Sequence, residues 1–181
     1  NSVLLANKIT PIFLKGTGNL LAEIYDDIGE RMVGDIDFIF SKEDYPKAIT
    51  ILRDFGYCDV LKIDNRLPQF HHYQRLKKKN NIAAIEIHKE LLVTKKYVNE
   101  FNYSYVEKDG QFINDIAVLS YANKLNLSII ANQINDNSFY YKTMALRNAY
   151  DVFLLSKKTD AKDAVNTLDN LTNPLNCFLA A

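Results

Sequence analysis

Two aspartates, Asp35 and Asp37, stand two residues apart in the segment Gly-Asp-Ile-Asp-Phe-Ile-Phe at residues 34–40. The segment predicts a short strand, in which side chains alternate between two faces, so both carboxylates project from one face and the apolar side chains from the other. Ionised carboxylates this close repel each other, and burying them is costly unless a cation compensates. The pair therefore indicates a divalent metal site, although an Asp-x-Asp pattern by itself is also common in turns and on surfaces.

A third carboxylate, Glu86, stands between Ile85 and Ile87 in a second apolar segment, residues 82–88. A strand with one buried face seldom gives such a position to an unpaired acid, so Glu86 needs a partner, which a metal ion would supply. His88 is predicted to share the face of Glu86. It could orient that carboxylate, contact substrate or serve only as a structural histidine.

Small and basic residues precede the aspartates in the chain. The apolar run at residues 9–14 predicts a strand that ends in Lys15-Gly16-Thr17-Gly18, where two glycines permit a tight turn and close backbone approach. Lys15 could contact a phosphate or only end the strand in solvent. Arg31 could contact a phosphate or only pair with Glu30 or Asp27 at the surface.

The elements that must position these residues alternate in type through the first half of the chain. Helices are predicted at residues 19–25 and 41–55, and strands at 57–63, 70–77 and 82–88, the last two as a hairpin. From about residue 90 the pattern becomes helical, with an interruption at 103–113 and helices at 115–131, 138–156 and 160–168. We therefore predict an α/β (α+β) fold, with a mixed sheet and flanking helices at residues 1–92 and a mainly helical subdomain at residues 93–181.

Composition narrows the class of protein. The 181 residues include 22 basic and 22 acidic side chains, so any surface for nucleic acid must be local, and the hydrophobic fraction of 48% is ordinary for a globular domain. Two cysteines without paired spacing argue against a disulfide scaffold or a zinc site. No run approaches the roughly 20 apolar residues that span a bilayer, so we expect a cytoplasmic protein without a membrane partner.

The order of these motifs resembles the nucleotidyltransferase superfamily of the DNA polymerase β type, and above all its group of uncharacterised nucleotidyltransferases. The resemblance rests on Lys15-Gly16, Arg31 and Asp35-Ile36-Asp37 within residues 9–92, and more weakly on Leu146-Arg147 and Asp151-Val152. The sequence is also similar to nucleotidyltransferase toxins of the abortive-infection type. It departs from the family at Gly16-Thr17, where Gly-Ser or Gly-Gly is usual, and at Glu86, where an aspartate is common.

The resemblance implies an enzyme that moves a nucleoside monophosphate from a nucleoside triphosphate to a hydroxyl and releases pyrophosphate. In that role Asp35, Asp37 and Glu86 would be catalytic and would hold two Mg²⁺ ions, or Mn²⁺ in their place. The nucleotide would be bound by Lys15, Gly16, Thr17 and Arg31. The acceptor stays open between tRNA, a protein and a small molecule.

Two other hypotheses compete with this interpretation. One is a catalytically silent nucleotide-binding or partner-binding module on the same fold. The other is a small α/β regulator, whose resemblance to the family is accidental and in which Asp35, Asp37 and Glu86 lie far apart.

Overall fold

A mixed β-sheet runs through the part of the chain that the structure, a computed structural model, describes: residues 1–60 and 72–167. Its strands are β1 (Ile12–Phe13), β2 (Asp35–Ile39), β3 (Tyr57–Asp59), β4 (Leu76–Lys78), β5 (Ala84–His88), β6 (Gln111–Ile113) and β7 (Ile116–Val118). They lie in the order β3-β4-β5-β2-β1-β7-β6. β2 pairs with β5 and β1 with β7 in parallel, while the other neighbours are antiparallel.

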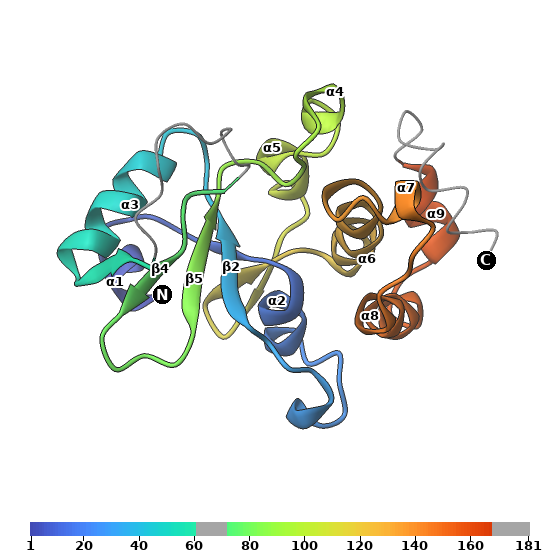
Figure 1. Cartoon of the computed structure of the whole chain (residues 1–181), viewed down its shortest axis with the longest axis horizontal. Coiled ribbons are helices and arrows are strands. Elements are labelled where there is room, and N and C mark those ends of the chain that lie inside the picture. The colour runs from blue at the N-terminus through green and yellow to red at the C-terminus, as the bar shows by residue number, and fades with distance from the viewer. Residues whose placement is uncertain (61–71, 168–181) are drawn as a thin grey trace.

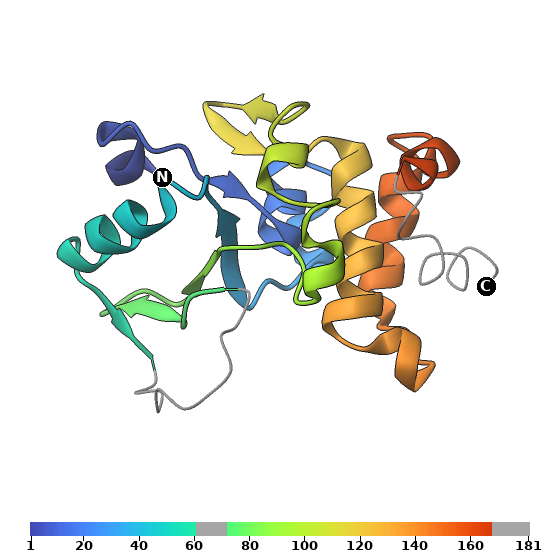
Figure 2. The same cartoon turned by 90° about the horizontal axis from the view of Figure 1, so that it is seen from above.

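Helices cover both faces of this sheet (Figures 1 and 2). On one side lie α1 (Ser2–Ala6) and α3 (Tyr45–Asp54), and on the other α2 (Lys15–Leu21), α6 (Tyr121–Ile130) and α8 (Leu146–Ser156). The shorter elements are η1 (Ile28–Glu30, a 3-10 helix), α4 (Lys95–Val98), α5 (Tyr103–Val106), η2 (Ala131–Asn135, a π-helix), α7 (Ser138–Tyr141) and α9 (Ala161–Asn166). The predicted α/β fold with a mixed sheet and flanking helices is therefore confirmed.

The alternation of side chains along β2 separates two hydrophobic cores. Phe38 packs into a core with Leu52 of α3, and Ile39 packs into a second core with Leu125 of α6. Asp35 and Asp37 share the face of Ile39, because residues two apart in a strand point the same way. The acids therefore face the side of the sheet that α2, α6 and α8 cover.

The segment predicted as a glycine turn is instead the first turn of a helix. α2 already begins at Lys15, which has a positive φ of 50°, and ends at Leu21, so the predicted helix at residues 19–25 lies too late in the sequence. Gly18 lies so close to β1 that a Cβ atom there would be 2.6 Å from the Phe13 carbonyl oxygen. The glycine is needed for close packing of helix on strand rather than for a turn.

The predicted helix at residues 115–131 is wrong in its first part. Asn114 and Asp115 both have positive φ values, 48° and 61°, which is the backbone of a two-residue hairpin turn, and it joins β6 to β7. α6 begins only after Ser120, whose hydroxyl accepts a hydrogen bond from the Asn123 N–H. The apolar run of β7 is used for pairing with β1, a contact that helical periodicity does not reveal.

The second half of the chain thus contributes two strands to the sheet, while the boundary predicted after residue 92 stays a prediction. The helix predicted at residues 138–156 is divided into α7 and α8, because Lys142 ends α7 in the left-handed region at φ 55°. The strands predicted at 57–63 and 70–77 appear in part, as β3 and β4; β4 begins only at Leu76, and residues 73–75 belong to no strand. Their remaining residues within 61–71, and the residues from 168 onward, lie outside the described part of the chain.

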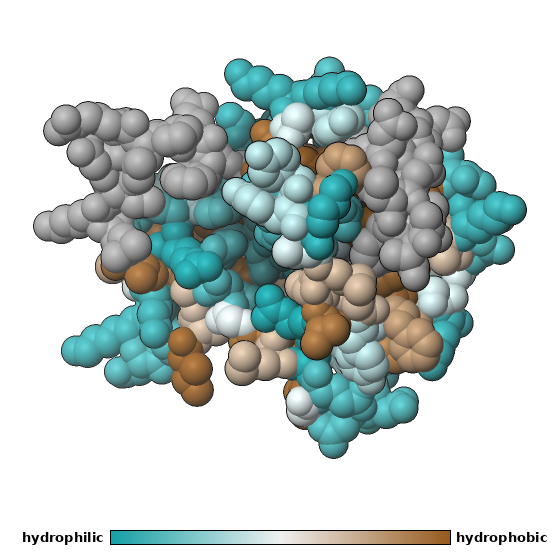
Figure 3. Space-filling view, turned by 45° about the vertical axis from the view of Figure 1, so that its right-hand side comes forward, coloured by the Kyte–Doolittle hydropathy of each residue, from teal (hydrophilic) through white to brown (hydrophobic). Residues whose placement is uncertain are grey.

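Large apolar side chains are also exposed, among them Ile28, Met32 and Leu146. On the face that Figure 3 shows, apolar side chains lie scattered among hydrophilic ones. Single exposed apolar residues of this kind are normal for a protein surface. Within the described residues, no helix has the length and apolar character that crossing a membrane would require.

Candidate active site

The parallel pairing of β2 and β5 brings the three predicted acids together. Asp37 is the register partner of Glu86. Asp35, two residues earlier on the same strand face, is the partner of Ala84. Asp37 and Glu86 are each only 7% exposed. The hypothesis of an unrelated α/β regulator predicts distant acids, and the structure shows the opposite.

Asp37 is the most heavily bonded of the three acids. Its Oδ1 accepts hydrogen bonds from Lys15 Nζ at 2.7 Å and from His88 Nε2 at 2.8 Å. Burial alone would raise the pKa of Asp37, but the hydrogen bond from His88 and the charge of Lys15 outweigh it and lower the pKa to about 2. Asp37 is therefore a carboxylate at any physiological pH.

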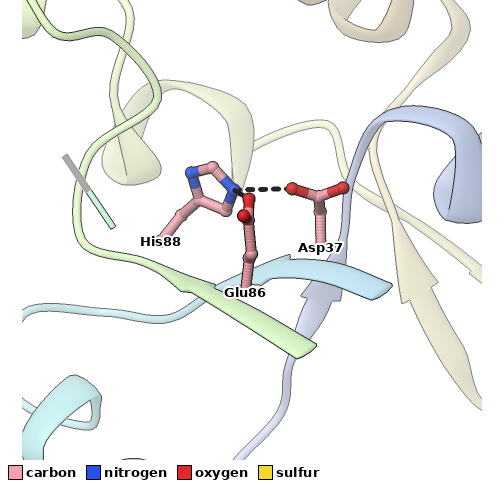
Figure 4. Close-up of side chains that lie close together, drawn as sticks. All are labelled: Asp37, Glu86 and His88. Atoms are coloured by element: carbon pink, nitrogen blue, oxygen red, sulfur yellow. Dashed lines mark hydrogen bonds and ion pairs between the residues drawn. The ribbon is translucent and has the colours of Figure 1, made fainter. Parts of the chain in front are cut away.

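His88 belongs to the same cluster, as Figure 4 shows. Its Nε2 lies 3.9 Å from Oε2 of Glu86 as well as within hydrogen-bonding distance of Asp37. The ring is 1% exposed, and this burial lowers the pKa of His88 even though Asp37 favours the charged form. Burial thus favours the uncharged imidazole, and because a carboxylate only accepts, the hydrogen bond to Asp37 needs the tautomer with a proton on Nε2, which a bound cation would displace.

The donor set of this cluster fits a divalent cation. One potential ligand atom from each of Asp37, Glu86 and His88 lies within 4.8 Å of the others. Carboxylates suit Mg²⁺ and Mn²⁺, and an imidazole is more usual at Mn²⁺ than at Mg²⁺. The predicted metal ligands were Asp35, Asp37 and Glu86. The structure brings Asp37 and Glu86 together with His88 and places Asp35 beside them.

Arg75, which the sequence analysis missed, connects Asp35 to Glu86. Its Nη2 lies 2.8 Å from Oδ2 of Asp35, and its Nε donates to Oε1 of Glu86 at 2.6 Å. Burial raises the pKa of Asp35 in spite of the arginine, and the neighbouring Glu86 and Asp37 raise it further. The predicted hairpin could have pointed to Arg75 as a neighbour of Glu86, because the observed pairing of Leu76 with Ile85 places residue 75 opposite residue 86.

Three of the four residues predicted to bind the nucleotide, Lys15, Gly16 and Arg31, line the same site, and Thr17 follows Gly16 in the first turn of α2. Lys15 pairs with Asp37, and the Thr17 hydroxyl donates to the backbone carbonyl of Asp35 at 3.3 Å. Gly16 leaves room for Arg31, since a Cβ atom there would be 3.0 Å from Arg31 Nη2. Whether these residues bind phosphate stays a prediction. Their positions bring Lys15, Gly16 and Arg31 to one wall.

Arg31 makes a buried ion pair rather than one of the surface pairs that were considered. Its Nε and Nη2 donate to the carboxylate of Asp151 in α8 at 3.1–3.2 Å, and both side chains are less than a tenth exposed. Asp151 also accepts a hydrogen bond from the Tyr25 hydroxyl at 2.7 Å. Glu30 and Asp27 instead form the capping box of η1. The pair joins α8 to the segment that leads into β2.

These walls enclose a cavity of about 530 Å³. The acids of β2 and β5, with Lys15 and Arg75, form one side, while the end of α6, η2 and α8 form the other. Figure 1 shows α6 and α8 facing the sheet across α2. A volume of this size is typical of small-molecule sites, and here most of the lining is polar or charged.

Comparison with known proteins identifies the family. A family model described as uncharacterised nucleotidyltransferase matches residues 1–181. The chain belongs to this family. The predicted enzyme class, a nucleotidyltransferase, is thereby confirmed.

Two solved structures share the fold of this nucleotidyltransferase. The antibiotic-resistance factor ANT(2'')-Ia, determined in solution, has 8% identity and a TM-score of 0.60, with 99% of this chain and 90% of that chain covered. The lincosamide antibiotic adenylyltransferase LnuA, in its lincomycin-bound crystal structure, has 18% identity and a TM-score of 0.54, with 87% and 92% covered. A search of curated protein sequences gave no match.

Proposed function

We propose that the protein is a divalent-metal-dependent nucleotidyltransferase that moves a nucleoside monophosphate from a nucleoside triphosphate to a hydroxyl acceptor. The observation that carries this proposal is the cavity in which Asp35, Asp37 and Glu86 converge, with Lys15 beside them and Arg31 against Gly16. Membership of the family supports transfer of a nucleotide. The choice of Mg²⁺, with Mn²⁺ as the alternative, rests on the carboxylates of the donor set.

Asp37, Glu86 and His88, with Asp35 beside them, are the residues that would hold the cation. When bound, the cation would supply charge neutralisation to the phosphates and to the attacking and leaving oxygens. Lys15, which contacts Asp37 in the same cluster, would pair with the triphosphate and hold it in line with the acceptor. Arg31 would face the phosphates from the Gly16 wall while Asp151 fixes its guanidinium.

Glu86 is the proposed proton acceptor. As the acceptor hydroxyl attacks the α-phosphorus, a new O–P bond forms, the bond to pyrophosphate breaks, and the hydroxyl proton moves to Glu86. Asp37 is a poorer base because its pKa is lowered to about 2. Positioning and charge stabilisation supply most of the catalysis in such transfers.

A small molecule is the first acceptor class to test. One of the structures that share this fold is a lincosamide antibiotic adenylyltransferase bound to lincomycin, and the cavity has the volume of a small-molecule site. Transfer to tRNA or to a protein is the alternative that the same assay detects. A catalytically silent nucleotide-binding module is the competing function.

The test is incubation of the protein with each α-labelled nucleoside triphosphate, Mg²⁺ and panels of hydroxylated small molecules, tRNA and proteins. Asp37→Asn removes a proposed metal ligand, and Asp59→Asn is a matched control because Asp59 is an aspartate on β3 that pairs with Arg53. Label transfer by the parent and by Asp59→Asn, but not by Asp37→Asn, supports the proposal. Binding of nucleotide without transfer to any panel supports the silent module, and absence of binding contradicts both.

A further inference from the structure

Arg75 pairs with Asp35 and with Glu86, and Glu86 is also one of the three residues whose ligand atoms lie close enough together to hold a cation. Its guanidinium contacts one oxygen of Asp35 and one oxygen of Glu86, at 2.8 and 2.6 Å, and so spans two strands of the sheet. The hydrogen bond to Glu86 and the charges of the nearby carboxylates raise the pKa of Arg75, and the side chain is still 56% exposed and lines the cavity. An exposed side chain of this length can change partners without disturbing a packed core.

The charges of the site favour a change of partners by Arg75 when a cation binds. Three carboxyl groups, those of Asp35, Asp37 and Glu86, pair there with two cationic side chains, Lys15 and Arg75. A divalent cation at the same carboxylates would lie beside the guanidinium, and the two positive charges would repel each other. A triphosphate arriving with the cation offers the guanidinium new oxygens, because the planar fork of arginine matches the geometry of phosphate as well as that of carboxylate.

We propose that Arg75 exchanges Asp35 and Glu86 for the phosphates of the nucleotide when the metal binds, and thereby couples binding of the metal to binding of the nucleotide. This inference rests on the proposed function and assigns a nucleotide-binding role to a residue outside the Lys15-Gly16-Thr17 segment. Without nucleotide, Arg75 lowers the affinity of the site for the metal. With nucleotide, Arg75 stabilises the complex of protein, metal and nucleotide.

A purely structural role for Arg75 makes a different prediction. If its ion pairs only hold β4 against β5, their loss would lower the stability of the site and weaken metal and nucleotide binding together. Exchange predicts opposite signs for the two affinities. The sign of the change in metal affinity, measured without nucleotide, therefore separates the two roles.

The experiment uses Mn²⁺ as a probe, titrated by electron paramagnetic resonance into the protein without nucleotide. The second measurement is the affinity for a non-hydrolysable α,β-methylene triphosphate at saturating Mg²⁺, by calorimetry. The variants are Arg75→Gln, Arg75→Lys and the control Arg53→Gln. Arg53 is matched because it also pairs with a carboxylate, that of Asp59 at 2.6 Å, and is 40% exposed.

For Arg75→Gln we expect Mn²⁺ affinity without nucleotide to rise about threefold to tenfold, in proportion to the loss of two partly exposed ion pairs. The affinity for the triphosphate analogue should fall about tenfold, which corresponds to one charge-assisted contact with phosphate. Arg75→Lys keeps the charge but cannot bridge two carboxylates, so both changes should be smaller. Arg53→Gln should bind Mn²⁺ and analogue as the parent does.

Unchanged or weaker Mn²⁺ binding by Arg75→Gln, with the fold intact by circular dichroism, overturns the exchange. Unchanged affinity for the analogue overturns the phosphate contact. If Arg75→Gln does not fold, Arg75→Lys decides by the same two signs. If the parent protein binds no triphosphate in the presence of Mg²⁺, both the proposed function and this inference are contradicted. If the parent binds the triphosphate, and Arg75→Gln has the same affinities for Mn²⁺ and for the analogue as the parent, only this inference is contradicted.

Discussion

Replacing Asp151 with alanine removes a carboxylate that holds two elements far apart in the sequence. Asp151 accepts three contacts from the Arg31 guanidinium, at 3.1–3.2 Å, and a fourth from the Tyr25 hydroxyl at 2.7 Å. Asp151 is 3% exposed and Arg31 is 9% exposed. The variant would leave a buried arginine without its counter-charge, which typically costs about 3–5 kcal/mol of unfolding free energy. That is a large fraction of the stability of an ordinary domain.

Urea denaturation followed by circular dichroism measures this cost, with an unchanged m-value as the condition for comparing free energies. Asp151→Asn keeps one acceptor oxygen for Tyr25 and Arg31 to share, but it loses the charge and puts an NH2 group in place of the second oxygen, so it should cost about 2 kcal/mol. Asp59→Ala is the matched control, because Asp59 also pairs with an arginine but at a more exposed position, and it should cost at most about 1 kcal/mol.

The double variant Arg31→Met, Asp151→Leu tests the reason for the cost. Apolar side chains of similar volume remove both buried charges, so the double variant should be more stable than Asp151→Ala, since a buried ion pair can often be replaced at little net cost. Its affinity for nucleotide should fall nonetheless, because Arg31 is a predicted nucleotide ligand. An Asp151→Ala variant within about 1 kcal/mol of the parent would refute the argument that this ion pair braces the cavity wall.

Three further perturbations have expected outcomes. Lys124, 3% exposed, has its pKa lowered to about 8 by burial, so the folded state binds fewer protons than the unfolded state between pH 8 and the ordinary lysine pKa of about 10.4. Unfolding free energy should therefore rise with pH across that window, and Lys124→Met should be more stable than the parent by about 2 kcal/mol at pH 7, with little advantage at pH 10.5 in urea titrations. Gly18→Ala should cost about 1–3 kcal/mol in thermal unfolding, because its Cβ would meet the Phe13 carbonyl oxygen at 2.6 Å, whereas a Cβ at Gly34 meets nothing within 4 Å. Removal of divalent cations with a chelator should abolish label transfer, and added Mg²⁺ or Mn²⁺ should restore it.

Each of these has an outcome that contradicts its reasoning. A flat pH dependence for the parent between pH 8 and 10.5, or the same slope in Lys124→Met, would show that Lys124 keeps its charge in the folded state. Equal melting temperatures for Gly18→Ala and Gly34→Ala would show that α2 can move away from β1. Transfer that persists with the chelator would contradict a metal-dependent reaction.

The first half of the fold follows from local patterns. The alternation of acid and apolar residues over β2, the amphipathic helix that becomes α3 and the isoleucines around Glu86 each depend on side-chain periods of about 2 or 3.6 residues, which a short window of sequence reveals. The family resemblance rests on the same segments and is confirmed over the whole chain. The roles of Asp35, Asp37, Glu86 and the nucleotide-binding residues stay predictions, although all of them except Thr17 line one cavity.

Errors of prediction concentrate where a long-range contact overrides a local pattern. β7 was predicted as helix because its apolar residues satisfy either period, and only pairing with β1, about 100 residues earlier, makes it a strand. The turn at Lys15 was predicted from two glycines, of which Gly18 allows close packing of α2 on β1 and Gly16 leaves room for Arg31. In both cases the residue types were informative, but their structural partner lay elsewhere in the chain.

The sequence by itself determined which acids share a strand face, because alternation is a property of the backbone alone. Tertiary structure decided which basic side chains pair with the acidic ones. Arg75 reaches Glu86 through the register of β4 on β5, and Asp151 reaches Arg31 across 120 residues through the packing of α8. Charge pairing acts over a few ångströms in space and is independent of separation along the chain, so the neighbours of each carboxylate become known only when the elements are packed.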